Sequence, residues 1–138
     1  MKILVFLQFE DGKINSTSLE AIVAAQITTN EKNIKVVTFS EEAANQLKSY
    51  NLNQIILCND PELYSYNPLF YLSAMQQIIL KENPDLIFFG HTYQARDWVP
   101  RLSARLDKPF ISDCTDIISD DDIKFIRSIY QGKINSLV

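Results

Sequence analysis

Four short runs rich in β-branched and aromatic residues recur along the chain, and segments with helical spacing separate them. A run that is apolar at nearly every position suits a strand buried on both faces, as in a parallel sheet. The alternation therefore predicts βαβ units with right-handed crossovers, and helices on both faces of a mostly parallel sheet. The runs are Lys2–Phe9, Asn33–Phe39, Gln54–Cys58 and Leu86–Phe89.

The first predicted helix follows a turn at Asp11-Gly12-Lys13. Thr17 is followed at the third position by Glu20, which is a capping-box pattern, so we expect Thr17 to cap this helix. Residues at helical spacing predict the face that packs on the sheet. They are Leu19, Ile22, Val23, Gln26 and Ile27, and the helix is expected to end within Thr28–Asn30.

Two further helices carry clear start signals. Ser40 is placed to cap one of them, because Glu41 and Glu42 would then complement the dipole of its first turn. Asn67-Pro68 predicts the start of the other, which continues to about Glu82, with Asn as the cap and Pro at the first helical position. The predicted inward face of this longer helix is Leu69, Leu72, Gln76 and Ile79.

A last helix is predicted over Ala95–Leu106, with an apolar face that includes Trp98 and Val99. Pro100 lies inside that span, and proline is best tolerated in the first turn of a helix. We therefore expect the helix to begin near Trp98. Asp107-Lys108-Pro109 predicts its end.

The pattern changes after this helix, where extended segments follow one another without intervening helices. Two of them flank an acidic triplet and predict a β-hairpin with that triplet at its tip. The predicted elements are a short fifth strand at Phe110–Asp113, a hairpin of Thr115–Ser119 and Ile123–Tyr130 around Asp120–Asp122, and an extended segment at Lys133–Val138. We expect residues 1–138 to form a single α/β domain.

Length and composition favour one folded domain. The 138 residues are 46% hydrophobic and 22% charged, as in an ordinary globular protein. The net charge of −4 argues against a nucleic-acid partner, because phosphate binding needs a clustered basic face. The apolar run at the N-terminus is too short to insert into a membrane and lacks the cleavage site of a signal peptide.

The cysteines and the histidine do not predict a metal site. The chain has two cysteines, Cys58 and Cys114, without a CxxC motif, and a single histidine. We interpret both cysteines as reduced thiols in a reducing compartment. Asp120–Asp122 could suggest a cation site, but the spacing of a calcium-binding loop is missing, and a solvated turn is the preferred interpretation.

The segment after the fourth predicted strand is the strongest candidate for a ligand site. In open α/β sheets, ligands bind beyond the carboxyl ends of the strands at the switch point of the strand order. Gly90 and Thr92 follow this strand, and Arg96 lies where the next helix starts, so backbone amides and a guanidinium could receive a phosphate there. The alternative, which we prefer, is that Arg96 and Asp97 simply cap and solvate the helix start.

Other candidates for chemistry are weaker. His91 could act as a general base of a small hydrolase, but no nucleophile elbow or partner carboxylate stands near it in the sequence. Tyr64, Tyr66 and Tyr71 could stack on a ligand, although packing in the core or an interface is preferred. We therefore predict no catalytic residue.

Glycine is too scarce for a glycine-rich phosphate loop. The chain has only three glycines, with no GxGxxG after the first strand and no GxxxxGK[ST]. This excludes a standard dinucleotide or P-loop site.

Several segments follow one another in an order and spacing typical of one protein family. Gly90–Leu106 joins Gly-x-Thr to a basic–acidic pair and then to a helix that begins Pro-Arg. Ser112–Ile117 and Arg127–Lys133 follow, and Ile3–Phe6 leads through Asp11–Lys13 to Ser18–Ala21 at the start of the chain. Together they resemble the N-terminal domain of the electron-transfer flavoprotein alpha subunit over essentially the whole chain. Family members commonly have Gly at the position of Ala95 and Pro at that of Ser128.

The resemblance implies a three-layer Rossmann-like fold, related to the adenine-nucleotide-hydrolase-like folds. It implies a heterodimer with a beta subunit, which carries electrons on FAD from dehydrogenases of the acyl-CoA dehydrogenase type, as in fatty acid beta-oxidation. A membrane quinone reductase then passes them to the respiratory chain. The chain would be an electron-carrier component rather than an enzyme, cytoplasmic in a bacterium or in the mitochondrial matrix of a eukaryote.

In that family FAD is held mainly by a C-terminal domain, which we expect to follow Val138 and which is absent from this chain. The N-terminal domain is expected to act as a scaffold without a cofactor of its own. We carry over no FAD-contacting residue, and Gly90, Thr92 and Arg96 are predicted only as a vestigial cleft at the switch point. The alternative function is a stand-alone adenine-nucleotide-binding α/β module.

Overall fold

The protein is described here by a computed structural model, which places residues 2–29, 33–49, 54–90, 92–108, 114–119, 123–129 and 134–137. Its strands are β1 (Ile3–Leu7), β2 (Phe9–Glu10), β3 (Lys13–Ile14), β4 (Ile34–Thr38), β5 (Gln54–Leu57), β6 (Leu86–Phe89), β7 (Cys114–Ser119), β8 (Ile123–Ile129) and β9 (Ile134–Leu137). Its helices are α1 (Ser16–Thr28), α2 (Glu41–Gln46), α3 (Pro68–Glu82) and α4 (Tyr93–Leu106), with single 3-10 turns η2 (Leu47–Ser49) and η3 (Pro61–Leu63).

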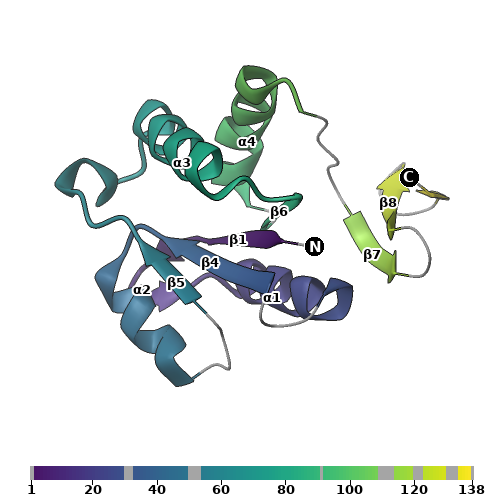
Figure 1. Cartoon of the computed structure of the whole chain (residues 1–138), viewed down its shortest axis with the longest axis horizontal. Coiled ribbons are helices and arrows are strands. Elements are labelled where there is room, and N and C mark those ends of the chain that lie inside the picture. The colour runs from purple at the N-terminus through teal and green to yellow at the C-terminus, as the bar shows by residue number, and fades with distance from the viewer. Residues whose placement is uncertain are drawn as a thin grey trace.

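The central sheet is parallel and has the order β5-β4-β1-β6. In its register, Val5 of β1 lies between Val36 of β4 and Phe88 of β6. Figure 1 shows α3 and α4 on one side of the sheet and α1 and α2 on the other. The prediction of a parallel sheet with helices on both faces is therefore confirmed.

The apolar run of β1 is explained by its central position in the sheet. Side chains alternate between the two faces of a strand, so each face of β1 enters a different core. Ile3, Val5 and Leu7 pack with α1 and with Leu47 of η2, whereas Leu4 and Phe6 pack with α3 and α4. All of them are at most 5% exposed, which is why no polar alternation marks this strand.

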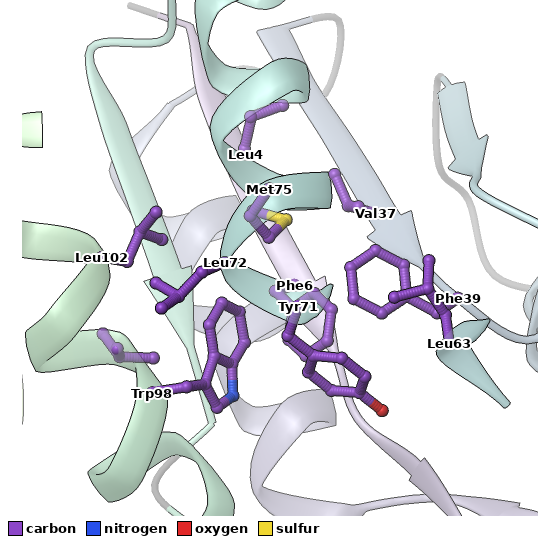
Figure 2. Packing of buried hydrophobic residues seen from close by; sticks show 11 residues of the cluster. Leu4, Phe6, Val37, Phe39, Leu63, Tyr71, Leu72, Met75, Trp98 and Leu102 are labelled. Atoms are coloured by element: carbon purple, nitrogen blue, oxygen red, sulfur yellow. The ribbon is translucent and has the colours of Figure 1, made fainter. Parts of the chain in front are cut away.

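The core beneath α3 and α4 is built on aromatic rings. Trp98, only 1% exposed, meets Phe6 and Phe89 edge-on, with ring centroids 5.1 and 5.3 Å apart. Figure 2 shows Tyr71 of α3 and Trp98 of α4 packed with Phe6 of β1, in a cluster that continues to β4. Edge-to-face pairs of this kind add about 0.5–1.5 kcal/mol each beyond their buried area.

The start of α1 differs from the sequence prediction. Asn15, not Thr17, is the cap: its side-chain oxygen accepts a hydrogen bond from the Thr17 amide at 2.9 Å. The capping-box prediction was wrong because Asn15, directly before the helix, is an equally good cap and lies at the end of the β2–β3 turn.

The inward face of α1 was also only partly predicted. Ile22 is buried as expected, but the other buried positions are the small residues Ser18, Ala21 and Ala25. Val23 and Ile27 are 54% and 63% exposed. Small side chains let the helix approach the sheet closely, and this close approach turned the face away from the larger apolar residues.

The remaining helices confirm most of their predicted starts. Ser40 caps α2 and Asn67 caps α3, with Pro68 in its first turn. The inward face of α3 is Tyr71, Leu72 and Met75, so the prediction for Leu69, which is 60% exposed, was wrong. The run of apolar residues along this helix offers two competing faces, and only packing selects between them.

Helix α4 begins at Tyr93, a full turn before the predicted start near Trp98. Thr92 caps it, with its hydroxyl oxygen accepting from the Ala95 amide at 3.0 Å. Pro100 consequently lies in the interior of the helix. The buried face of Trp98, Val99 and Leu102 holds the proline-containing turn in place, and tertiary packing thus outweighs the cost of the missing N–H.

The predicted hairpin near the C-terminus is confirmed. β7 and β8 pair antiparallel, and β9 adds to β8 in a separate sheet of order β7-β8-β9. β7 lies beside α1. The predicted acidic tip at Asp120–Asp122 and the predicted strand at Phe110–Asp113 lie outside the described residues.

Candidate functional site

The switch point of the sheet lies between β1 and β6. From β1 the strand order proceeds outward to β4 and β5, and the chain then crosses back to place β6 on the other side of β1. In an open α/β sheet this reversal opens a crevice beyond the carboxyl ends of the two strands that flank it. Gly90 and Thr92, which follow β6, lie where the sequence predicted a cleft.

A buried polar network crosses this switch point. The Thr92 hydroxyl donates to Oε1 of Gln8 at 2.6 Å, and the backbone amide of Gln8 donates to Oγ of Ser18 at 3.0 Å. Gln8 and Ser18 are only 7% and 0% exposed. The network ties the ends of β1 and β6 to the first turn of α1, and of its members only Thr92 was predicted as a site residue.

Gly90 closes the same region by close packing. A Cβ at this position would lie 2.7 Å from both the Ser18 amide nitrogen and Oγ1 of Thr17. Contacts this short are sterically forbidden, so glycine is required for the end of β6 to approach α1. The end of β6 and the first turn of α1 are thus in direct contact.

The three predicted cleft residues are therefore used in different ways. Gly90 packs against α1, and Thr92 both caps α4 and bonds Gln8. Arg96 lies in the first turn of α4 with an exposed side chain. His91 lies outside the described residues.

A second polar cluster fastens the start of α4 to the loop that precedes α3. The Tyr66 hydroxyl donates to Oδ2 of Asp97 at 2.6 Å, and Oδ1 of Asp97 pairs with the Arg101 guanidinium at 3.2 Å. Partial burial, and then the hydrogen bond to the Asp97 carboxylate, raises the pKa of Tyr66 well above its ordinary value. The hydroxyl therefore stays protonated and acts as a structural donor.

Cys58, at the end of β5, is a free thiol and is the cysteine whose side chain the structure describes. Cys58 is half-buried. Burial, and then the negative charge of Asp60, raises the pKa of its thiol. Because the thiolate is the reactive form, these surroundings favour an unreactive thiol.

A hollow lies one strand away from the switch point, beyond the carboxyl ends of β1, β4 and β5. Its volume is about 280 Å³, and its walls include Phe39, Tyr64 and Tyr71. Sequence reasoning named both tyrosines and preferred a packing role for them. The ring of Tyr71 does pack in the core, as Figure 2 shows, and the residue also lines the hollow. The sequence feature that could have indicated this hollow is a tyrosine, rather than a phenylalanine, on the buried face of a helix.

None of the helices in the described ranges combines the length and the apolar character that a membrane span requires.

Comparison with known proteins places the chain in one family. Residues 3–138 match the electron transfer flavoprotein domain family. The chain is 32% identical over 136 residues to an electron transfer flavoprotein subunit alpha of Bacillus subtilis (strain 168), covering 96% of the chain and 42% of that protein. It is also 32% identical over 142 residues to an acryloyl-CoA reductase electron transfer subunit beta of Anaerotignum propionicum, covering 98% of the chain and 39% of that protein.

A eukaryotic relative shows the same degree of similarity. It is a probable mitochondrial electron transfer flavoprotein subunit alpha of Cryptococcus neoformans, 32% identical over 136 residues, which cover 94% of the chain and 38% of the relative. The chain thus spans about two-fifths of the length of these relatives. The match over nearly every residue, together with the parallel α/β fold, establishes that this chain belongs to the electron transfer flavoprotein family and corresponds to a domain of its alpha subunits.

Proposed function

We propose that the chain is the N-terminal scaffold and subunit-interface domain of an electron transfer flavoprotein alpha subunit. The observation that carries this proposal is the family match over residues 3–138, with alpha subunits among the relatives. The complete protein would pair with a beta subunit and carry electrons on FAD from dehydrogenases to the respiratory chain. The domain would contribute assembly and orientation, and no catalytic group.

The electron donor is proposed to be a dehydrogenase of the acyl-CoA type, as in fatty acid beta-oxidation. One relative is named as an electron transfer subunit of acryloyl-CoA reductase, which supports chemistry on acyl-CoA substrates for the partner enzyme. A membrane quinone reductase would accept the electrons. The proposed location is the cytoplasm in a bacterium and the mitochondrial matrix in a eukaryote, where one relative is named as mitochondrial.

The described residues do not fit FAD. A dinucleotide needs a long cleft and a close backbone approach to its pyrophosphate, which glycine-rich turns normally provide. Here the switch point is packed by Gly90, Thr92 and Gln8, and the neighbouring hollow of about 280 Å³ is too small for a dinucleotide. We therefore propose that the flavin belongs to the C-terminal domain of the complete alpha subunit.

Co-purification tests the assembly half of this proposal. The complete gene product, including whatever is encoded after Val138, is expressed with the beta-type subunit from the same genome, and only the first carries an affinity tag. We expect a stable 1:1 complex by size-exclusion chromatography with light scattering. Recovery of the tagged subunit alone, folded and without the beta-type subunit, would contradict the proposal.

A further inference from the structure

The hollow beyond β1, β4 and β5 has the position of a small-molecule site. Ligands of open α/β sheets bind beyond the carboxyl ends of the strands, and small-molecule sites are concave and mostly apolar with a few polar groups. Phe6 and Phe39 form part of the apolar wall, and Tyr71 enters from α3. The volume of about 280 Å³ suits a compact ligand, smaller than a dinucleotide.

Tyr71 supplies an unsatisfied polar group in this wall. The residue is only 9% exposed, and its hydroxyl has no hydrogen-bond partner within the part of the chain that the structure describes. Buried polar groups in native proteins nearly always have a partner, so each exception needs an explanation. In Figure 2 the hydroxyl points away from the packed side chains, and the residue lines the hollow.

The direction of this hydroxyl is fixed by the core. The Tyr71 ring meets Phe39 edge-on at a centroid distance of 4.9 Å, and meets Trp98 and Tyr66 at 5.5 and 5.1 Å. With Phe6 as a fourth aromatic neighbour, at a centroid distance of 6.1 Å, the ring is held in one orientation. The group is therefore presented to the hollow in advance, as a preorganised donor or acceptor.

The rim of the hollow selects against negative charge. Glu41, an acidic residue in the first turn of α2, is among the residues that line it. On the other side, the Tyr64 hydroxyl donates to Oδ1 of Asn59 at 2.9 Å, which holds a largely exposed aromatic ring at the entrance. A carboxylate and an amide suit the hydroxyl groups of a sugar, whereas a phosphate would be repelled by Glu41.

From this arrangement we propose that the hollow binds a planar heteroaromatic ring without negative charge, of the purine nucleoside class. The ring lies against the aromatic wall, and its polar edge bonds the Tyr71 hydroxyl. The sugar hydroxyls face Glu41 and Asn59. This site is independent of the flavin and of subunit assembly, and differs from an adenine-nucleotide site in its preference for a ligand without phosphate.

Calorimetric titration of the full chain, alone or in the complex in which it is obtained, tests the proposal with adenosine and AMP as probes. We expect saturable binding of adenosine and weaker binding of AMP. Tyr71→Phe keeps the ring and removes the hydroxyl, and should weaken adenosine binding about three- to tenfold. Tyr66→Phe is the matched control, because Tyr66 bonds Asp97 outside the hollow and its loss should leave adenosine affinity unchanged.

Glu41→Gln provides a second readout that does not depend on Tyr71. Removing the carboxylate should reduce the ratio of the adenosine affinity to the AMP affinity by about threefold or more. Thermal unfolding checks each variant, and Tyr71→Phe should be at least as stable as the wild type since its hydroxyl has no partner to lose among the residues that the structure describes. The absence of saturable adenosine binding would overturn the proposal, as would equal losses of affinity in Tyr71→Phe and Tyr66→Phe.

Discussion

The Thr92 hydroxyl donates to Oε1 of Gln8 at 2.6 Å and joins the carboxyl ends of two neighbouring strands, β6 and β1. The same hydroxyl oxygen accepts from the Ala95 amide and caps α4. Thr92→Val keeps the shape of the side chain but removes both bonds and leaves a buried acceptor on Gln8. We expect a loss of about 2–3 kcal/mol in the free energy of unfolding, measured in urea.

Thr92→Ser is the control for this prediction, because it retains the hydroxyl. It should stay within about 0.5 kcal/mol of the wild type. If Thr92→Val were as stable as Thr92→Ser, the hydroxyl would not hold the switch point together.

The close packing of Gly90 predicts a steric penalty for any side chain there. In Gly90→Ala the new Cβ would meet the backbone of Thr17 and Ser18, so α1 and the end of β6 must move apart. We expect a loss of about 1–3 kcal/mol in unfolding free energy, as for other overpacked sites. Gly12, at φ +77° with open space around it, offers a contrast: Gly12→Asn should be nearly neutral because asparagine tolerates the left-handed region. Equal effects of the two substitutions would contradict the steric explanation.

The capping of α1 can be tested by comparing two neighbouring residues. Asn15→Ala removes the side chain that accepts from the Thr17 amide, and should cost about 1 kcal/mol of stability. Thr17→Ala should cost clearly less, since the Thr17 side chain donates to Asn15 rather than capping the helix itself. The urea midpoints of the two variants measure this difference in stability. A larger loss of stability for Thr17→Ala than for Asn15→Ala would favour the capping box predicted from the sequence.

An ion-pair cluster at the opposite edge of the sheet predicts a pH dependence. Oε2 of Glu82, at the end of α3, lies 2.7 Å from Nζ of Lys35 and 3.0 Å from Nζ of Lys2, with the Glu82 side chain 13% exposed. Hydrogen bonds from Lys35 and then from Lys2 lower the pKa of Glu82 below its ordinary value of 4.5. The stability that this carboxylate contributes is therefore complete above pH 4.5 and is lost as the pH falls through the lowered pKa.

Glu82→Gln should accordingly lower the unfolding free energy at pH 7 by about 1 kcal/mol, the upper range for partly exposed pairs. The difference from the wild type should shrink below pH 4.5 and vanish in stronger acid. Urea unfolding of both proteins at several pH values measures it. A difference that stays constant across that range would show that the charge of Glu82 is not what stabilises the fold.

The fold was largely predictable because its strands and helix starts are encoded locally. The run around Val5 and the caps at Ser40 and Asn67 depend on neighbours in the sequence, and the structure confirms them. The inward faces of α1 and α3 were less predictable, since Val23 and Leu69 are as apolar as the residues that are buried instead. Only the close approach of small residues such as Ala25 to the sheet decides between the faces.

The position of the candidate site could be predicted from the sequence, but the contacts within it could not. The switch point followed from the strand pattern, but its closure depends on Gln8 and Ser18 meeting Thr92, and these residues are far apart in the sequence. Nothing local marks Gln8 as buried. The hollow beside Tyr71 likewise arises from three strand ends and a helix that come together only in the folded chain.

The most direct test of the central claim is the visible absorption spectrum of two purified samples. One is this 138-residue chain alone, and the other is the complete gene product co-purified with its beta-type subunit. A scaffold domain predicts flavin bands in the complex and none in the chain alone. Flavin bound to the isolated chain would contradict the account, because the described residues leave no cleft for it at the switch point.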